Sequence, residues 1–152
     1  MAQAFTPILP FTTTANTYGL DQNCYYCSVA ALSNMTVEQF FNVSEIMQQD
    51  TATPTEILAL WAEGGVTNVE YLAYTGPNTV SDVSQTVIKD MPKGQALGLA
   101  YARQDGSGHM VVLAKDNNGL VRCVDYQQNP PTITPFPPEP NLIAMFVFYK
   151  TP

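Results

Sequence analysis

The sequence predicts an α+β fold, with helices in the first half of the chain and antiparallel strands in the second. Apolar residues recur with helical spacing between Asn23 and Gly65, whereas β-rich runs separated by turn sequences dominate from Gln95 onward. This segregation of helices and strands along the chain is typical of α+β domains. A length of 152 residues, 45% of them hydrophobic and 12% charged, fits a single packed domain.

The beginning of the chain, residues 1–22, is expected to be an extended lead-in, because it holds prolines and a glycine and shows no apolar period. Residues 23–152 then form one domain. Its first helix is predicted over about residues 24–34, since Asn23 is a good N-cap. The residues spaced to share one face of this helix are Cys24, Cys27, Ala31 and Met35.

Two more helices are predicted before the first strand. One runs from Val37 to about Met47 behind a Thr36 cap. The other has the clearest start signal in the chain, the capping box Thr53-Pro54-Thr55-Glu56 with proline at the first helical position. This helix is expected to end at Gly64-Gly65.

The remaining elements are separated by turn sequences. A strand is predicted from Val69 to Tyr74, and a fourth helix opens at Thr79 and reaches about Met91. Four further strands are expected at Gln95–Arg103, His109–Lys115, Leu120–Gln127 and Ile143–Tyr149. The six prolines between residues 130 and 140 indicate a stiff surface loop before the last strand.

Charge and hydropathy argue against several classes of function. Thirteen acidic against six scattered basic residues give a net charge of −7, so we expect no binding to nucleic acid. No apolar run reaches the roughly 20 residues of a membrane span, and the first residues lack the features of a Sec-type signal peptide. The protein is therefore expected to be soluble. Its three cysteines are too few for a disulfide framework and serve as free thiols, ligands or a nucleophile.

The candidate chemistry begins with the two cysteines in the first turn of the first predicted helix, where the helix dipole favours a thiolate. The single histidine, His109, heads a predicted strand, and Asp125 lies on the next one. If residues 117–119 form a three-residue hairpin loop, His109 faces Gln127 and Asp125 faces Val111. The imidazole and the carboxylate then share one face of the sheet, as diagonal neighbours within side-chain reach.

These residue types form a nucleophile, a base and an orienting acid. Cys24 attacks, His109 takes the thiol proton, and Asp125 holds the imidazole tautomer. Cys24 is favoured as the nucleophile because it directly follows the N-cap. The residues that could bind the oxyanion or orient this triad are Gln22, Asn23 and Gln127.

Three sequence blocks resemble the motifs of bacterial papain-fold toxin domains, many of which are regarded as protein glutamine deamidases. The blocks are Asn23-Cys24-Tyr25-Tyr26-Cys27-Ser28-Val29-Ala30-Ala31, Gly108-His109-Met110-Val111-Val112 and Val124-Asp125-Tyr126-Gln127. The resemblance spans about residues 22–128. Tyr126 stands where proline is usual in that family, at a position that takes no part in the reaction. Bacteriocin-processing and other papain-like peptidases share the same order of Cys, His and Asp.

The resemblance implies a papain-like fold, with N-terminal helices packed on a C-terminal antiparallel sheet. It implies a cysteine-dependent amide hydrolase that needs no cofactor and no metal, acts on a target protein, and favours glutamine deamidation. It further implies an exported effector that works in the cytosol of a target cell, and a cognate immunity protein in the producing cell.

Several alternatives stay open. Cys27 replaces Cys24 as the nucleophile if Cys24-x-x-Cys27 corresponds to the Cys-x-x-Cys of plant papains. A cysteine peptidase or a cell-wall amidase is the alternative enzyme, and a catalytically inert papain-like binding module is the alternative of a different class. A structural zinc site of the Cys3His type is a further one, with the ligands Cys24, Cys27, His109 and Cys123. A thioredoxin-type redox motif is disfavoured, because residues 11–22 do not read as a strand.

Overall fold

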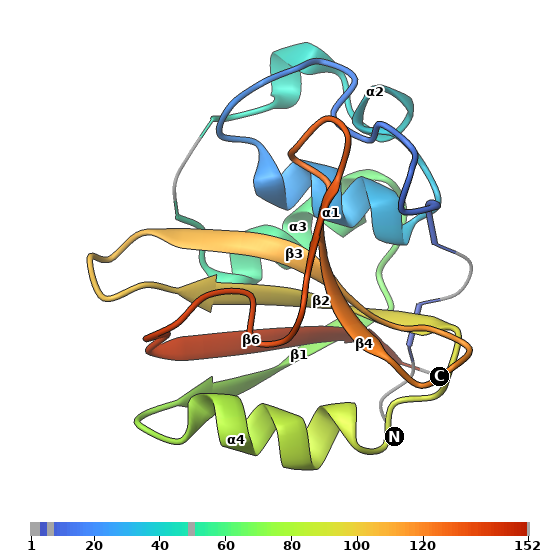
Figure 1. Cartoon of the computed structure of the whole chain (residues 1–152). Helices are drawn as coiled ribbons and strands as arrows, with labels where there is room; N and C mark the ends of the chain where they lie inside the picture. Colours follow the sequence, from blue (N-terminus) through green and yellow to red (C-terminus); the bar gives the residue numbers. More distant parts are fainter. Residues whose placement is uncertain (1–3, 6–7, 49–50, 152) are drawn as a thin grey trace.

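The computed structural model describes residues 4–5, 8–48 and 51–151, which form an α+β fold around one six-stranded antiparallel sheet (Figure 1). The strand order is β1-β6-β2-β3-β4-β5. The strands are β1 (Val69–Thr75), β2 (Gln95–Ala102), β3 (Gly108–Lys115), β4 (Val121–Asp125), β5 (Thr132–Thr134) and β6 (Ala144–Lys150). The predicted fold class is confirmed as a mixture of helices and an antiparallel sheet.

The α-helices lie on both faces of this sheet. Their bounds are α1 (Cys24–Leu32), α2 (Val37–Phe40), α3 (Pro54–Glu63) and α4 (Thr79–Val83). Helices α1 and α3 cover one face, and α4 covers the other, against β1 and β6 (Figure 1). No helix among the described residues is long and apolar enough to cross a membrane.

Helix α1 is the central element of the larger core. All nine of its residues are buried, because β2 and β3 pack on one side of it and α2 and α3 on others. It is apolar all round, which is the pattern of a helix enclosed by its domain rather than one lying at the surface. The sequence predicted one apolar face for this helix, whereas the structure buries it on every side. Met35 lies beyond the end of the helix and is 40% exposed.

The predicted lead-in packs on the same core as α1. Among its described residues, 4–5 and 8–22, there is no helix and no strand, only an isolated bridge between Phe5 and Ala96. Leu9 and Ala15 are buried in the larger core, and the Leu9 backbone N–H donates to the Ala31 carbonyl at 2.9 Å. Residues 1–3 and 6–7 of the predicted lead-in lie outside the described residues.

The two faces of the sheet carry separate apolar cores, as the alternation along β3 illustrates. Met110 and Val112 face α1 in the larger core, whereas Val111 and Leu113 belong to the smaller core beneath α4. Helix α1 packs on β2 and β3, and Cys24 at its start interacts with His109 near the start of β3. The Ser28 hydroxyl fixes this approach by donating to the Met110 carbonyl at 3.0 Å.

Helix α3 begins and ends as predicted. The Thr53 hydroxyl accepts from the Glu56 N–H at 3.2 Å, and the Glu56 carboxylate accepts from the Thr53 N–H at 2.9 Å. This reciprocal capping box occupies two of the backbone donors that a helix start leaves unpaired.

Two of the other predicted helices are too long. The prediction from Val37 to Met47 is wrong, because α2 ends at Phe40 and Phe41 is extended. The Asn42 side chain then accepts from the Ser44 N–H at 3.1 Å and starts a separate 3₁₀ turn, Val43–Glu45. Asparagine competes with helical hydrogen bonding in this way.

The last helix also stops earlier than predicted. Helix α4 ends at Val83 and continues as a turn of π-helix, Ser84–Ile88, instead of reaching Met91 as an α-helix. Pro92 lies just beyond, and a proline restricts the residue before it to non-helical conformations.

The hairpin between β3 and β4 has the predicted register. Val112 pairs with Val124, and Leu113 pairs with Cys123. The Asp116 carboxylate holds the turn by accepting from the N–H groups of Asn118 and Leu120, each at 2.9 Å.

The proline-rich segment contains one strand that the sequence pattern did not indicate. Residues Thr132–Thr134 form β5, and Ile133 pairs with Val124. The strand is short and lies at the edge of the sheet, where flanking prolines are tolerated because one side of the strand needs no partner.

Candidate active site

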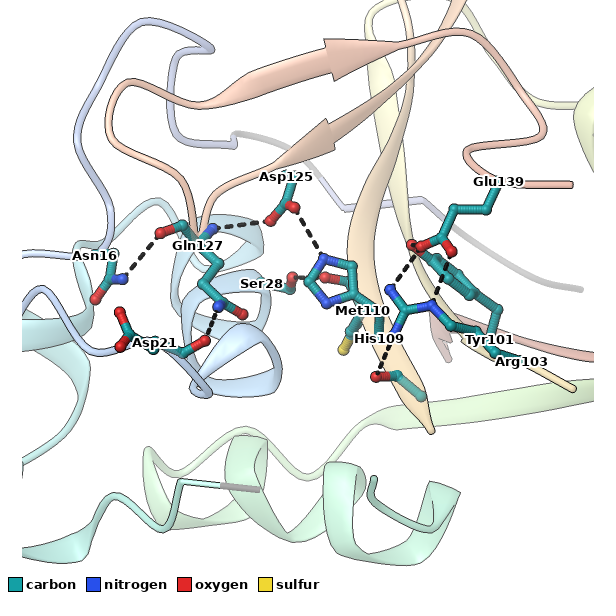
Figure 2. A network of polar contacts seen from close by, with 11 residues as sticks. Asn16, Asp21, Ser28, Tyr101, Arg103, His109, Met110, Asp125, Gln127 and Glu139 are labelled. Atoms are coloured by element: carbon teal, nitrogen blue, oxygen red, sulfur yellow. Dashed lines mark hydrogen bonds and ion pairs between the residues drawn. The ribbon is translucent and has the colours of Figure 1, made fainter. Parts of the chain in front are cut away.

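The hairpin register brings His109 and Asp125 together. Asp125 Oδ2 lies 2.9 Å from His109 Nε2, and the Asp125 Oδ1 accepts from the Gln127 backbone N–H at 3.0 Å (Figure 2). Both carboxylate oxygens are thus occupied, and the pair is mostly enclosed, with side-chain exposures of 14% and 21%. Because Asp125 accepts the proton on Nε2, Nδ1 is the nitrogen available to another partner.

Cys24, the first residue of α1, also interacts with the imidazole. Burial lowers the pKa of His109, but hydrogen bonds with Asp125 and Cys24, together with the charges of both, outweigh it and raise the pKa to about 10. A thiol, an imidazole and a carboxylate are therefore lined up from α1 through β3 to β4. The first residue of a helix also has an unpaired backbone N–H that can face a substrate.

The other two cysteines have environments that disfavour a thiolate. Cys27 is fully buried, and burial, with smaller contributions from Cys24 and Asp125, holds the pKa of its thiol far above the ordinary range. Burial alone raises the pKa of Cys123 to about 12. All three cysteines are free thiols.

Asn23 occupies the predicted N-cap position, but its side chain makes no capping hydrogen bond. The amide is fully buried and donates to Asn16 Oδ1 at 2.9 Å. It is thus directed into the protein. Gln22 is exposed, and among the described residues its side-chain amide has no hydrogen-bond partner.

Gln127 acts on the site through its backbone and its side chain. Besides donating its N–H to Asp125, it donates a side-chain N–H to the Asp21 carbonyl. It therefore ties the end of β4 to the segment that precedes Cys24 (Figure 2).

Beside His109 lies a polar cluster that the sequence reasoning missed. The Tyr101 ring meets the His109 ring edge to face, with centroids 5.8 Å apart, and its hydroxyl donates to Glu139 at 2.7 Å. Arg103 forms two hydrogen bonds with Glu139, at 2.8 and 2.6 Å (Figure 2). A cavity of about 220 Å³ adjoins this cluster, His109 and Asp125. The signal available for Tyr101 was hairpin register, since it pairs with His109 across β2 and β3.

The second missed residue is Asn16, in the predicted lead-in. It is only 3% exposed and hydrogen-bonds with residues on both sides of the site. Its sequence surroundings contain no periodicity or motif that points to such a role.

The Cys3His zinc set is not assembled. Within residues 4–5, 8–48 and 51–151, no three His, Cys, Asp or Glu side chains are grouped so that they could hold a metal ion. Cys24 and His109 interact with each other, whereas Cys123 contributes to the smaller core.

No protein-family model matches the chain, and no curated protein is significantly similar to it.

The coupling of His109 to its neighbours is testable by NMR, because the chain has a single histidine ring to observe. We expect its C2–H resonance to titrate at about pH 10, and at lower pH in Asp125→Asn and Cys24→Ala, which each remove one interaction that raises the pKa. Cys123→Ala is the control and leaves the midpoint unchanged. A midpoint near the ordinary 6.5 in all four proteins contradicts the geometry.

The raised pKa of His109 also predicts how the stability of the folded protein changes with pH. Because the folded-state pKa of His109 is raised above 6.5, protonation contributes stability in full below about pH 6.5 and loses it as the pH rises toward about 10.

Proposed function

We propose that this protein is a papain-like cysteine hydrolase that cleaves an amide of a target protein. The observation that carries the proposal is the placement of His109 between Asp125 and Cys24, with the thiol at the start of a helix. A nucleophile, a base and an orienting acid in hydrogen-bonded sequence are the minimum for thiol-dependent acyl transfer.

The chemistry follows from these positions. The Cys24 sulfur attacks the carbonyl carbon after its proton has passed to His109 Nδ1, and the carbonyl oxygen becomes an oxyanion that the Cys24 backbone N–H can receive. Gln22 is the candidate for a second donor, since its side chain is exposed and Asn23 is directed inward. His109 then protonates the leaving nitrogen, which departs as ammonia or an amine, and a thioester remains. Water attacks the thioester with His109 as base, which releases the acid and restores the thiol.

Within this class, deamidation of a glutamine side chain is the preferred reaction. Cys24 is only 3% exposed, so little of this residue is accessible to a substrate. A side-chain carboxamide presents a small end group to such a residue, whereas a peptide bond brings main chain on both sides. The family resemblance of the three motifs favours the same reaction. A cysteine peptidase or a cell-wall amidase is the second candidate, supported by the same triad.

The biological setting rests on the resemblance alone. The resemblance implies an exported effector that acts on a protein in a target cell. It also implies a protective immunity protein in the producing cell. The alternative of a different class is a catalytically inert papain-like binding module, which holds a partner protein at the same site without turnover.

The reactions are separated by mass spectrometry of proteins from a lysate treated with the wild-type protein or with Cys24→Ala. We expect a target peptide whose mass increases by about 1 Da with the wild type only, as replacement of an amide by an acid requires. A cleaved chain supports the peptidase. A protein captured unchanged by both proteins supports the binding module and overturns the hydrolase.

A further inference from the structure

We propose that Asn16 is a positioning residue that aligns Asp125, and through it His109, with Cys24. This inference rests on the proposed function for its purpose, but it stands on contacts that exist without a substrate. Asn16 lies in the segment before α1, and its amide is the bridge between that segment and the end of β4 (Figure 2).

The orientation of the Asn16 amide is determined by its acceptors. Its Nδ2 donates to two carbonyl oxygens, those of Leu20 at 2.8 Å and Gln127 at 2.9 Å. Neither carbonyl can donate, so the amide cannot be reversed, and Oδ1 must face the Asn23 side chain, which donates to it at 2.9 Å. One amide thus satisfies three groups from two segments of the chain.

These contacts connect Asn16 with the neighbours of Cys24 and Asp125, the two outer residues of the triad. Asn23 directly precedes Cys24 in the chain. Gln127, whose carbonyl accepts from Asn16, donates its own N–H to Asp125 Oδ1 at 3.0 Å. The Asn129 side chain closes the bridge by donating to the Asn16 carbonyl at 2.9 Å. Asn16 therefore fixes how far the start of α1 stands from the carboxylate that orients His109.

A second observation supports a role beyond packing. Pairing Asn23 with Asn16 leaves Asn23 Oδ1 buried without a hydrogen-bond partner in the described part of the chain. Burying a carbonyl oxygen unpaired opposes folding. The arrangement is explained if it holds reactive groups in register, because a displacement of about 1 Å in such groups can lower a rate 10²-fold.

The test measures alkylation of Cys24 by iodoacetamide at neutral pH, with the modified residue identified by peptide mass. The reaction needs no substrate and reports how well His109 activates the thiol. In Asn16→Ala we expect the rate to fall about tenfold, as misalignment of a supported group predicts. The matched control is Val83→Ala, which truncates a fully buried residue in the core under α4 and leaves the rate unchanged.

A double-mutant cycle separates positioning from general loosening of the fold. If Asn16 acts through Asp125, Asn16→Ala has no further effect on alkylation in an Asp125→Ala background. If Asn16→Ala does not fold, Asn129→Ala replaces it, because Asn129 is exposed and contributes one hydrogen bond to Asn16. A smaller loss in the same direction is expected there.

The inference is overturned if neither variant changes alkylation more than Val83→Ala does, or if the losses from Asn16→Ala and Asp125→Ala multiply independently. Failure of the proposed function is a separate result. A protein that activates Cys24 through Asn16 but hydrolyses no amide retains the positioning residue and loses the hydrolase assignment.

Discussion

Cys24→Ala is expected to abolish amide hydrolysis, with a loss of about 10⁶-fold, because the group that forms the thioester is removed. The expected loss is chemical, not structural. Removing one buried sulfur costs on the order of 1 kcal/mol, which in a chain of this size lowers the melting temperature by about 2–4 °C. Release of ammonia, or the mass change in a target, measures the first effect, and thermal melting followed by circular dichroism measures the second.

Cys27→Ala is the matched control for this experiment. It makes the same substitution one turn further along the same buried helix, in a residue whose thiol is held protonated by burial. We expect a similar decrease in melting temperature and retained hydrolysis. Loss of activity in Cys27→Ala with retention in Cys24→Ala reverses the assignment of the nucleophile.

His109→Ala belongs to the same prediction. The chain has one histidine, so this single substitution removes every imidazole that could serve as a base. We expect a loss comparable to that of Cys24→Ala. Appreciable activity in His109→Ala contradicts any mechanism in which an imidazole takes the thiol proton.

Asp125→Asn is expected to have the second largest effect, a decrease of about 10⁴-fold in kcat, as loss of the orienting acid of a triad produces. Asparagine keeps the shape of the side chain but has one acceptor oxygen where aspartate has two. In this protein both oxygens accept, one from His109 and one from the Gln127 N–H. The amide NH₂ group must therefore face one of these donors, and whichever hydrogen bond is lost releases the imidazole.

The effect of Asp125→Asn has a spectroscopic signature besides activity. We expect the His109 resonance to titrate at a lower pH than in the wild type, because the carboxylate hydrogen bond and charge that raise the pKa are gone. An unchanged His109 titration curve together with full activity in Asp125→Asn would falsify the orienting role of Asp125. Glu139→Gln is the control, since Glu139 is an acid near His109 whose pKa is lowered mainly by its hydrogen bonds with Arg103.

The parts of the fold that local chemistry specifies were predictable from the sequence. The Thr53 capping box starts α3, and the short turn at Asp116 sets the register that places His109 beside Asp125. Those signals act over a few residues, so they do not depend on how the rest of the chain packs. The fourth helix also began at its predicted residue, Thr79, although no side-chain hydrogen bond caps it.

The errors arise where distant packing or side-chain competition decides the outcome. Phe41 and Asn42 lie within the helix predicted from Val37 to Met47, yet the Asn42 side chain starts a new turn there. Strand β5 exists because β4 offers it an edge, which the prolines around it do not reveal. An apolar period also could not show that α1 is enclosed on all sides.

In the candidate site, too, local patterns were predictable and long-range contacts were not. Cys24, His109 and Asp125 stood out because each combines a reactive side chain with a recognisable place on a helix or strand. Asn16 is an ordinary polar residue in a segment without pattern, and its contacts join positions more than 100 residues apart, such as Gln127. Hydrogen bonds between such distant residues leave no trace in local sequence.

The enclosure of α1 has different consequences for the lifetimes of its two thiols. Because every residue of α1 is buried between the sheet and the neighbouring helices, its backbone amides are expected to exchange with solvent more slowly than those of exposed segments. Cys24 keeps 3% of its surface exposed and can meet peroxide in the folded protein, whereas Cys27 is fully buried and is reached only when the fold opens. Irreversible oxidation of Cys27 is therefore governed by how often the fold opens, so that variants which open less often should keep this thiol reduced for longer.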